Sequence, residues 1–259
     1  MPFTLAHPAA VLPLRGLRYL RTAPLILGAM IPDLPYYVPS ELGRRLIPET
    51  HTFDGSLSTD LLLGYASLVA VFVLRAPLTA LLPARARWLC LNALAPFWRA
   101  REWAFAALAI VVGVWTHLVW DSFTHADGWM VHRVDALSAP VSIGPYTTQV
   151  CHVLQYVSSV FGLVVMAVWY ARLRTPRPIA AAPGAARSPV APVLLLVVAA
   201  AILIGSVQAV EHSNRWHSFY GTIDILLTRS LAWFAALYLV AGTIVALEQA
   251  HERVSDLST

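Results

Sequence analysis

Five apolar stretches, each close to the length of a membrane-spanning helix, constrain this chain more than any other feature of its sequence. They cover residues 56–74, 103–124, 153–171, 191–210 and 230–247. A helix needs about 20 predominantly apolar residues to cross the hydrocarbon core of a bilayer. The composition agrees, because 58% of the residues are hydrophobic and only 12% are charged, whereas soluble domains usually carry about 25% charged residues. The sequence therefore predicts an all-α integral membrane protein, a polytopic bundle of transmembrane helices.

The N-terminal segment, residues 8–32, is apolar but does not have the composition of a simple span. It contains Arg15, Arg18 and Arg21, together with Pro24. Arginine is costly in hydrocarbon, and proline interrupts helical hydrogen bonding. We therefore predict either a broken or re-entrant span, or an interfacial helix that is followed by a short inserted helix.

The placement of arginine predicts how the spans are oriented. Residues 75–102 contain five arginines and residues 172–190 contain four, whereas the alternate loops contain three in total. By the positive-inside rule, the two arginine-rich segments face the cytoplasm and the opposite ends of the spans face outward. Segment 172–190 is also rich in proline and alanine, as linkers are. It would separate a membrane bundle at residues 1–171 from a C-terminal part, 191–259, with two transmembrane helices and a short tail.

The most informative polar residues lie in the stretch Gly113-Val-Trp-Thr-His117-Leu-Val-Trp-Asp121-Ser-Phe-Thr-His125. On a helix, His117 and Asp121 are four residues apart and share a face. An ionisable pair is costly at membrane depth, and imidazole with carboxylate is a donor set that suits zinc or a similar divalent ion. The alternatives are a hydrogen-bonded pair that neutralises both groups, or a proton relay without metal. His125 either completes the site or interacts with the carbonyl groups at the helix C-terminus.

Two further candidates lie before the first long apolar stretch. Asp33 sits between Pro32 and Pro35, which hold the backbone off α-helical geometry at the end of an apolar segment. It is either a site carboxylate or an ordinary N-cap or turn aspartate. His51 closely precedes the stretch that begins at residue 56, and it is either a metal ligand or a loop histidine beside a capping side chain.

Three other polar residues have open roles. Asp60 lies one turn inside its span and needs a partner there, so it is either a ligand or a carboxylate that orients a metal-bound histidine. Gln155 lies one turn into the stretch 153–171 and either bridges helices by hydrogen bonds or points to the site. The role of His7 depends on the path of the N-terminal segment.

Other chemistries leave no motif in the sequence. Walker A, GxGxxG, HExxH and GxSxG patterns are all absent, and the chain has no lysine, which excludes Schiff-base chemistry. The arginines lie mainly in loops between the apolar stretches. The basic charge balance therefore reflects membrane orientation and predicts no nucleic acid partner.

Several short motifs carry a resemblance to a known family. They are the opening Met1-Pro-Phe-Thr-Leu-Ala-His7-Pro, Gly28-Ala-Met-Ile-Pro-Asp33, His51-Thr-Phe-Asp-Gly, Asp60-Leu-Leu-Leu-Gly64, Thr116-His117-Leu-Val-Trp-Asp121-Ser-Phe-Thr-His125 and Leu154-Gln155. In order and spacing, over about residues 1–170, they resemble the DUF4184 family of uncharacterised bacterial membrane proteins. Two positions depart from the pattern, because Thr59 stands where the family often has phenylalanine and Tyr156 where it often has histidine.

A more distant resemblance suggests a reaction. YdjM-like membrane-bound metal-dependent hydrolases, which in turn resemble the helical zinc-dependent phospholipase C fold, share a pattern of histidines and aspartates. The residues that fall on this pattern, in order, are His7, Asp33, His51, His117 and Asp121. The resemblance implies a protein of the bacterial cytoplasmic (inner) membrane. With more than four nitrogen and oxygen ligands available, one or two divalent ions remain possible, with zinc as the first choice.

The leading hypothesis is a membrane-embedded metal-dependent hydrolase whose site faces outward. His117 and Asp121 would form its catalytic centre, and a lipid-like (phospho)ester from the bilayer would be its substrate. The alternatives are a non-enzymatic transporter that uses the same ionisable cluster, and a membrane scaffold in which a buried His/Asp cluster only holds helices together.

Overall fold

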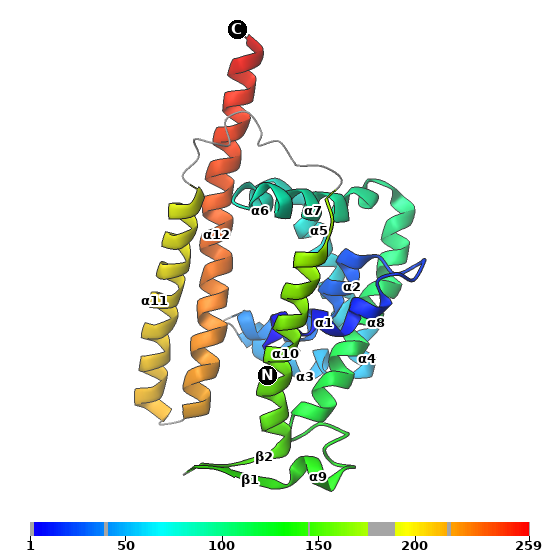
Figure 1. Cartoon of the computed structure of the whole chain (residues 1–259), viewed down its shortest axis with the longest axis vertical. Coiled ribbons are helices and arrows are strands. Elements are labelled where there is room, and N and C mark those ends of the chain that lie inside the picture. The colour runs from blue at the N-terminus through cyan, green and yellow to red at the C-terminus, as the bar shows by residue number, and fades with distance from the viewer. Residues whose placement is uncertain (1–2, 39–40, 145, 176–189, 217–218, 259) are drawn as a thin grey trace. The chain divides into compact units, whose positions relative to one another are not determined.

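The computed structural model describes residues 3–38, 41–144, 146–175, 190–216 and 219–258 (Figure 1). The chain divides into two compact units. The first comprises Met1–Leu68 and Phe97–Arg174, and the second comprises Val69–Pro96 and Thr175–Thr259. Of the predicted linker 172–190, residues 176–189 lie outside the described part of the chain.

Five helical stretches in the described residues are long and apolar enough to cross a membrane: Phe53–Val73, Ala100–Thr124, Val150–Arg172, Val190–Glu211 and Ile225–Glu252. They correspond one to one to the five apolar stretches of the sequence, and the prediction of a polytopic all-α bundle is confirmed. The first comprises α4 (Phe53–Ser56) and α5 (Thr59–Val73), and the second and third are α8 (Ala100–Thr124) and α10 (Val150–Arg172). The last two belong to α11 (Val190–Trp216) and α12 (Phe219–Ser258), both longer than the apolar stretches.

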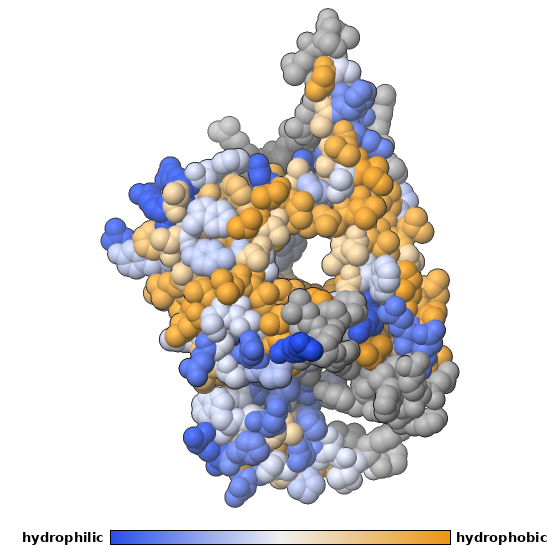
Figure 2. All heavy atoms as spheres, turned by 180° about the vertical axis from the view of Figure 1, so that it is seen from behind, coloured by the Kyte–Doolittle hydropathy of each residue, from blue (hydrophilic) through white to orange (hydrophobic). Residues whose placement is uncertain are grey.

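Side chains that would face lipid are apolar. On α10, Val157, Val160 and Phe161 are about three-fifths exposed, at 60%, 63% and 62%. Figure 2 shows hydrophobic residues over much of the visible surface, with hydrophilic ones gathered in separate patches. Contiguous exposed apolar surface of this extent is rare on soluble proteins and is expected where a helix contacts lipid.

The N-terminal segment is broken into short helical pieces, as predicted. They are η1 (Thr4–Ala6), α1 (Pro8–Val11), η2 (Leu12–Leu14), α2 (Thr22–Gly28) and η3 (Ile31–Tyr37). A proline occupies one of the first two positions of α1, η2 and η3, where its missing N–H costs nothing. No piece reaches the length of a span. Helices α1 and α2 pack on α8, and η1 and α1 pack on α10, so this segment folds against the long helices of the first unit.

A backbone-to-backbone approach fixes α2 on α8. A Cβ atom added at Gly28 would lie 2.3 Å from the Ile110 carbonyl oxygen, and one added at Gly113 would lie 2.4 Å from that of Leu25. Only glycine permits such an approach, which is typical of helix pairs in membranes. At the start of α8, the Arg21 guanidinium donates to the buried Glu102 carboxylate, with 2.5 Å between Nε and Oε2. Both contacts determine where α8 holds its polar face.

Two regions were not foreseen in the sequence. Residues 75–102 were expected to form a loop, but they contain α6 (Arg75–Ala80), α7 (Ala84–Leu94) and η4 (Ala95–Trp98) before α8 begins at Ala100. An antiparallel hairpin, β1 (Pro140–Ile143) with β2 (Tyr146–Gln149), follows the short helix α9 (Asp135–Ser138). Its Val141 pairs with Thr148.

The second unit is a simpler packing of helices. Helices α11 and α12 lie side by side, and α6 packs on α12 (Figure 1). The Tyr238 hydroxyl on α12 donates to the Leu78 carbonyl oxygen at 3.0 Å, and a small apolar cluster of Ala80, Leu81 and Val245 is buried nearby.

Candidate metal centre

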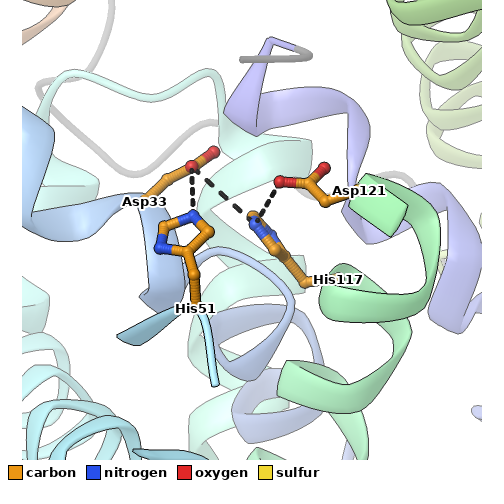
Figure 3. A group of neighbouring side chains, drawn as sticks. All are labelled: Asp33, His51, His117 and Asp121. Carbon is orange, nitrogen blue, oxygen red and sulfur yellow. Dashed lines mark ion pairs between the residues drawn. The ribbon is translucent and has the colours of Figure 1, made fainter. Parts of the chain in front are cut away.

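Four side chains from distant parts of the first unit point toward one another: Asp33, His51, His117 and Asp121 (Figure 3). Each offers one ligand atom, and these atoms all lie within 4.8 Å of one another. Asp33 comes from η3, and His51 directly follows α3 (Glu41–Thr50). His117 and Asp121 come from α8. The structure therefore brings together residues that are separated by up to 88 positions in the chain.

His117 and Asp121 lie on the same face of α8, as their spacing predicted. His117 Nε2 is 3.3 Å from Asp121 Oδ2, and the His117 side chain is fully buried. On the other side of the ring, His117 Nδ1 lies 2.9 Å from the Ala29 carbonyl oxygen. Because a carbonyl only accepts hydrogen bonds, Nδ1 carries a hydrogen. In the neutral imidazole the lone pair is then on Nε2, the nitrogen that faces the carboxylates.

Asp33 is fully buried, and one of its oxygens is hydrogen-bonded while the other faces two imidazoles. Its Oδ2 accepts a hydrogen bond from the Thr4 hydroxyl at 2.6 Å, and this hydroxyl also lies 2.6 Å from that of Tyr37. Its Oδ1 lies 3.8 Å from Nε2 of His117 and 3.8 Å from Nε2 of His51. Burial opposes ionisation of Asp33, but the surrounding imidazoles, His117 first, outweigh it and lower the pKa of this carboxyl.

His51 is positioned by the end of α3. Its Nδ1 lies 3.0 Å from the Ile47 carbonyl oxygen, so Nδ1 again carries the hydrogen and Nε2 faces Asp33. The Thr50 hydroxyl donates to the Pro32 carbonyl oxygen at 2.9 Å, which ties the end of α3 to η3. His51 is 25% exposed, so the cluster reaches the surface at this side chain.

Several polar atoms of the cluster are buried without a hydrogen bond among the described residues. They are His117 Nε2, Asp33 Oδ1, Asp121 Oδ1 and both ring nitrogens of His7. Buried polar atoms are rarely left unpaired, because each costs about 1–3 kcal/mol. The three measured N–O spacings of 3.3, 3.8 and 3.8 Å are close to the edges of about 3.4 Å in a tetrahedral zinc site with ligands about 2.1 Å from the ion. A cation between His117 Nε2 and Asp33 Oδ1 would satisfy these two atoms together.

His7 joins the edge of the cluster. Its ring stacks on that of His117, with centroids 3.8 Å apart and planes at 24°. Its Nε2 lies 3.5 Å from Asp121 Oδ1 and 4.0 Å from Asp33 Oδ2. Burial, together with the neighbouring His117, lowers the pKa of His7 to about 3. His7 is therefore neutral near pH 7, the state in which an imidazole binds a metal.

His125 stands at the rim. Its Nδ1 is 3.5 Å from Asp121 Oδ2 and 3.3 Å from the Asp121 carbonyl oxygen, and 26% of its side chain is exposed. The His125 ring thus lies near the Asp121 carboxylate, as a residue of the site would, and near a main-chain carbonyl of the last turn of α8, as a helix-terminal histidine would. The structure is compatible with both roles.

Asp60 and Gln155 are fully buried but are not among the four converging side chains. Within the described part of the chain, neither Asp60 oxygen and neither polar atom of the Gln155 side chain has a hydrogen-bond partner. Next to Gln155, the Ser159 hydroxyl donates to the Gln155 carbonyl oxygen at 2.7 Å and accepts from the Phe3 N–H at 3.0 Å. Helix α10 therefore anchors the chain segment that carries His7.

Sequence reasoning missed two groups that support the ligands. One is the Thr4 hydroxyl on Asp33, and the other is the Ala29 carbonyl on His117. The three-residue spacing of Thr4 and His7 was a weak signal for the first. The second is a main-chain group, which leaves no mark in side-chain identity.

The comparisons with known proteins identify a family but no reaction. No curated protein and no solved structure matches the chain. Residues 1–247 match the family described as a domain of unknown function, DUF4184. The match includes all the residues of the His/Asp cluster and extends through α11 into α12. The chain belongs to the DUF4184 family.

Proposed function

We propose that Asp33, His51, His117 and Asp121 bind a divalent metal ion, with zinc as the first choice, and that the protein is a membrane-embedded metal-dependent hydrolase. Its substrate would be a lipid-like (phospho)ester at the outer face of the cytoplasmic membrane of a bacterium. His7 and His125 would be additional ligands or would contact the substrate. Asp60 and Gln155 would support the site from outside the ligand set.

One observation carries the proposal: the unpaired nitrogen and oxygen atoms face one another. In both His51 and His117, a main-chain carbonyl holds Nδ1, and Nε2 faces Asp33 Oδ1. Metal-binding histidines almost always have this outer hydrogen bond, which fixes the tautomer and the ring orientation. A cluster that only held helices together would be expected to pair its atoms directly, because unpaired buried groups destabilise the fold.

The donor set determines what the site can do. Two imidazole nitrogens and two carboxylate oxygens suit zinc and comparable divalent ions. Such an ion would lower the pKa of a bound water and polarise a phosphoryl or acyl oxygen. The chain's own residues would hold the ligands and admit the substrate. The Thr4 hydroxyl and the Ala29 carbonyl hold Asp33 and His117, respectively, in place. The partly exposed His51 and His125 would line the path by which a substrate reaches the site.

The proposed reaction adds water across an ester. The water oxygen forms a bond to phosphorus or to the carbonyl carbon, and the bond from that atom to the leaving oxygen breaks. A proton from the water then passes to the leaving oxygen to give an alcohol. His125, whose Nδ1 lies 3.5 Å from Asp121 Oδ2 at the rim, would carry this proton.

The position of the cluster supports a lipid-like substrate. His117 and Asp121 lie in the last two turns of a span-length helix that ends at Thr124, and the arginine pattern of the sequence orients that end outward. A site at this depth is reached most directly by the ester region of a bilayer lipid. A transporter is less well supported, because the sequence shows no inverted repeat.

Metal analysis tests the proposal directly. Protein purified in detergent should carry stoichiometric metal by inductively coupled plasma mass spectrometry, and the double variant His117→Ala, Asp121→Ala should lose it. His132→Ala, which changes an exposed histidine outside the cluster, is the matched control and should retain the metal. Metal-free wild-type protein after purification and reloading with zinc would contradict the proposal.

The hydrolytic step needs its own measurement. The zinc-loaded protein in vesicles should release alcohol or phosphoester products from phospholipid, and the double variant should not. If the protein binds metal but hydrolyses neither phosphoester nor acyl ester lipids, the proposed metal centre is supported and the proposed hydrolase activity is contradicted.

A further inference from the structure

An apolar groove lies beside the cluster, between α8 and α10. Its volume is about 450 Å³, within the range of about 300–1,000 Å³ that is usual for ligand clefts. Val119 and Phe123 of α8, Leu154 of α10 and Ala10 of α1 are among the residues that line it. All of these residues belong to the first unit.

The polar groups that border the groove are turned away from it. Thr116 and Thr124 on α8 donate to main-chain carbonyl oxygens one turn earlier, Gly113 at 2.7 Å and Trp120 at 3.4 Å. The Ser158 hydroxyl accepts from Trp120 Nε1 at 3.1 Å. With these groups paired, the groove presents methyl groups and ring faces, so its occupant must be apolar.

The groove adjoins the cluster at two of its lining residues, Trp120 and Thr124. Its α8 wall runs from Thr116 to Thr124, a rise of about 12 Å at 1.5 Å per residue. The Trp120 ring forms the partition, because it lines the groove and also contacts the edge of His7 at a centroid distance of 5.7 Å. Thr124, at the end of the groove, lies beside His125, with 3.4 Å between Oγ1 and Nδ1.

We propose that this groove seats one acyl chain of a bilayer lipid and so delivers the ester end of that lipid to the His/Asp cluster. The occupant follows from the surroundings. Both walls are helices of membrane-spanning length and composition, so the groove opens where lipid hydrocarbon is the solvent. Its sides remain partly exposed, with Val119 at 43%, Phe123 at 38% and Leu154 at 36%.

The direction of the groove matches a lipid of the leaflet in which α8 ends. The tail would lie along α8 toward Thr116, and the ester end would lie at Thr124, next to His125. The inference rests on the proposed function for its chemistry, and it narrows the substrate class to esters that carry a long acyl chain.

Photocrosslinking tests the groove. The protein is placed in vesicles of phosphatidylethanolamine and phosphatidylglycerol, with some phosphatidylglycerol carrying a diazirine midway along one acyl chain. Mass spectrometry should map crosslinks to residues 116–124 and 154–158. Leu154→Trp should remove most of them, because the larger indole ring occupies the space that the acyl chain would fill.

A matched control separates the groove from general lipid contact. Leu163→Trp makes the same change on the same helix at a similar exposure, 38%, but Leu163 does not line the groove. This variant should leave the crosslinks at residues 116–124 unchanged. Equal losses of crosslinks in both variants would overturn the inference. So would the absence of crosslinks at residues 116–124 in the wild type, as expected if a second copy of the chain covers the groove.

The same samples distinguish the inference from the proposed function. In Leu154→Trp, hydrolysis of the phospholipid should fall far more than hydrolysis of the tailless bis(p-nitrophenyl) phosphate. In Leu163→Trp, metal content and both activities should equal those of the wild type. Groove crosslinks in a protein that binds no metal would support the acyl-chain seat and overturn the hydrolase. Metal binding and hydrolysis without groove crosslinks would support the hydrolase and overturn the acyl-chain seat.

Discussion

The two units of the chain use similarly apolar sequence in opposite ways. The second unit packs long, regular helices, and among its described side chains the buried polar residues are only Thr79 and Thr228. The first unit breaks its N-terminal segment into short pieces and buries histidine, aspartate, glutamate and glutamine. A segment that only spans a bilayer has no physical reason to bury such groups. The difference sets the first unit apart as the one that holds the candidate metal centre.

The largest expected effect is the loss of a ligand. Asp33→Ala should lower zinc affinity more than 100-fold, beyond the roughly 10–100-fold that groups outside the ligand set contribute. Competition with a fluorescent zinc chelator measures the affinity. Thr228→Ala changes a buried polar residue of the second unit and should have no effect. Equal losses in both variants would remove the contrast between the units.

A second pair of variants tests whether the close approach of backbones at a glycine is needed for metal binding or only for stability. A Cβ at Gly28 would lie 2.3 Å from the Ile110 carbonyl oxygen, and one at Gly242 would lie 2.2 Å from that of Pro77. Alanine at either position should lower stability by about 1–3 kcal/mol, because the backbones must separate. Thermal unfolding in detergent measures this loss.

Only Gly28→Ala should also weaken metal binding, since Gly28 directly precedes Ala29, whose carbonyl orients His117. If Gly242→Ala weakens zinc binding to the same extent, the site depends on general stability and not on the local approach of α2 to α8.

A smaller effect is expected at Thr4. Thr4→Val keeps the shape of the side chain but removes the hydroxyl that donates to Asp33 Oδ2. Zinc affinity should fall at least about tenfold while the metal stoichiometry stays the same. Thr228→Val is the matched control in the second unit, and its affinity should equal that of the wild type. An unchanged affinity in Thr4→Val would show that Asp33 needs no such support.

A further effect is a pH dependence of stability in the metal-free protein. Burial, with His117 nearby, lowers the pKa of His7 from 6.5 to about 3. Between these values the unfolded chain binds a proton that the folded chain does not, so stability falls as pH falls from 6.5 toward 3. His7→Gln should flatten this slope in thermal unfolding with a chelator present. His132→Gln should not, and an equally steep slope in His7→Gln would place its origin elsewhere.

The sequence predicted those parts of the molecule that follow from local pattern. Continuous apolar runs located the five spans, and the four-residue spacing placed His117 and Asp121 on one face of α8. The convergence of Asp33 and His51 on that pair was anticipated only through family resemblance. It depends on the route of the segment between Arg15 and Met30, which no periodicity specifies.

The remaining features depend on tertiary contact. The carbonyl of Ala29 reaches His117 because Gly28 and Gly113 let two backbones meet, and neither glycine reveals its partner in sequence. The helices α6 and α7 replace an expected loop, because arginine counts indicate which side of a membrane a segment occupies and not its secondary structure. The hairpin β1–β2 is too short to give a distinct alternating pattern.

The proposed ligands lie far apart in the sequence, so they are synthesised at different times. His51 leaves the ribosome 70 residues before Asp121, an interval of roughly 4–14 s at about 5–20 residues per second. During that time His7, Asp33 and His51 have no α8 to pack against, and hydrocarbon is a poor environment for them. The first 51 residues are therefore expected to stay in an aqueous or interfacial setting until α8 has inserted.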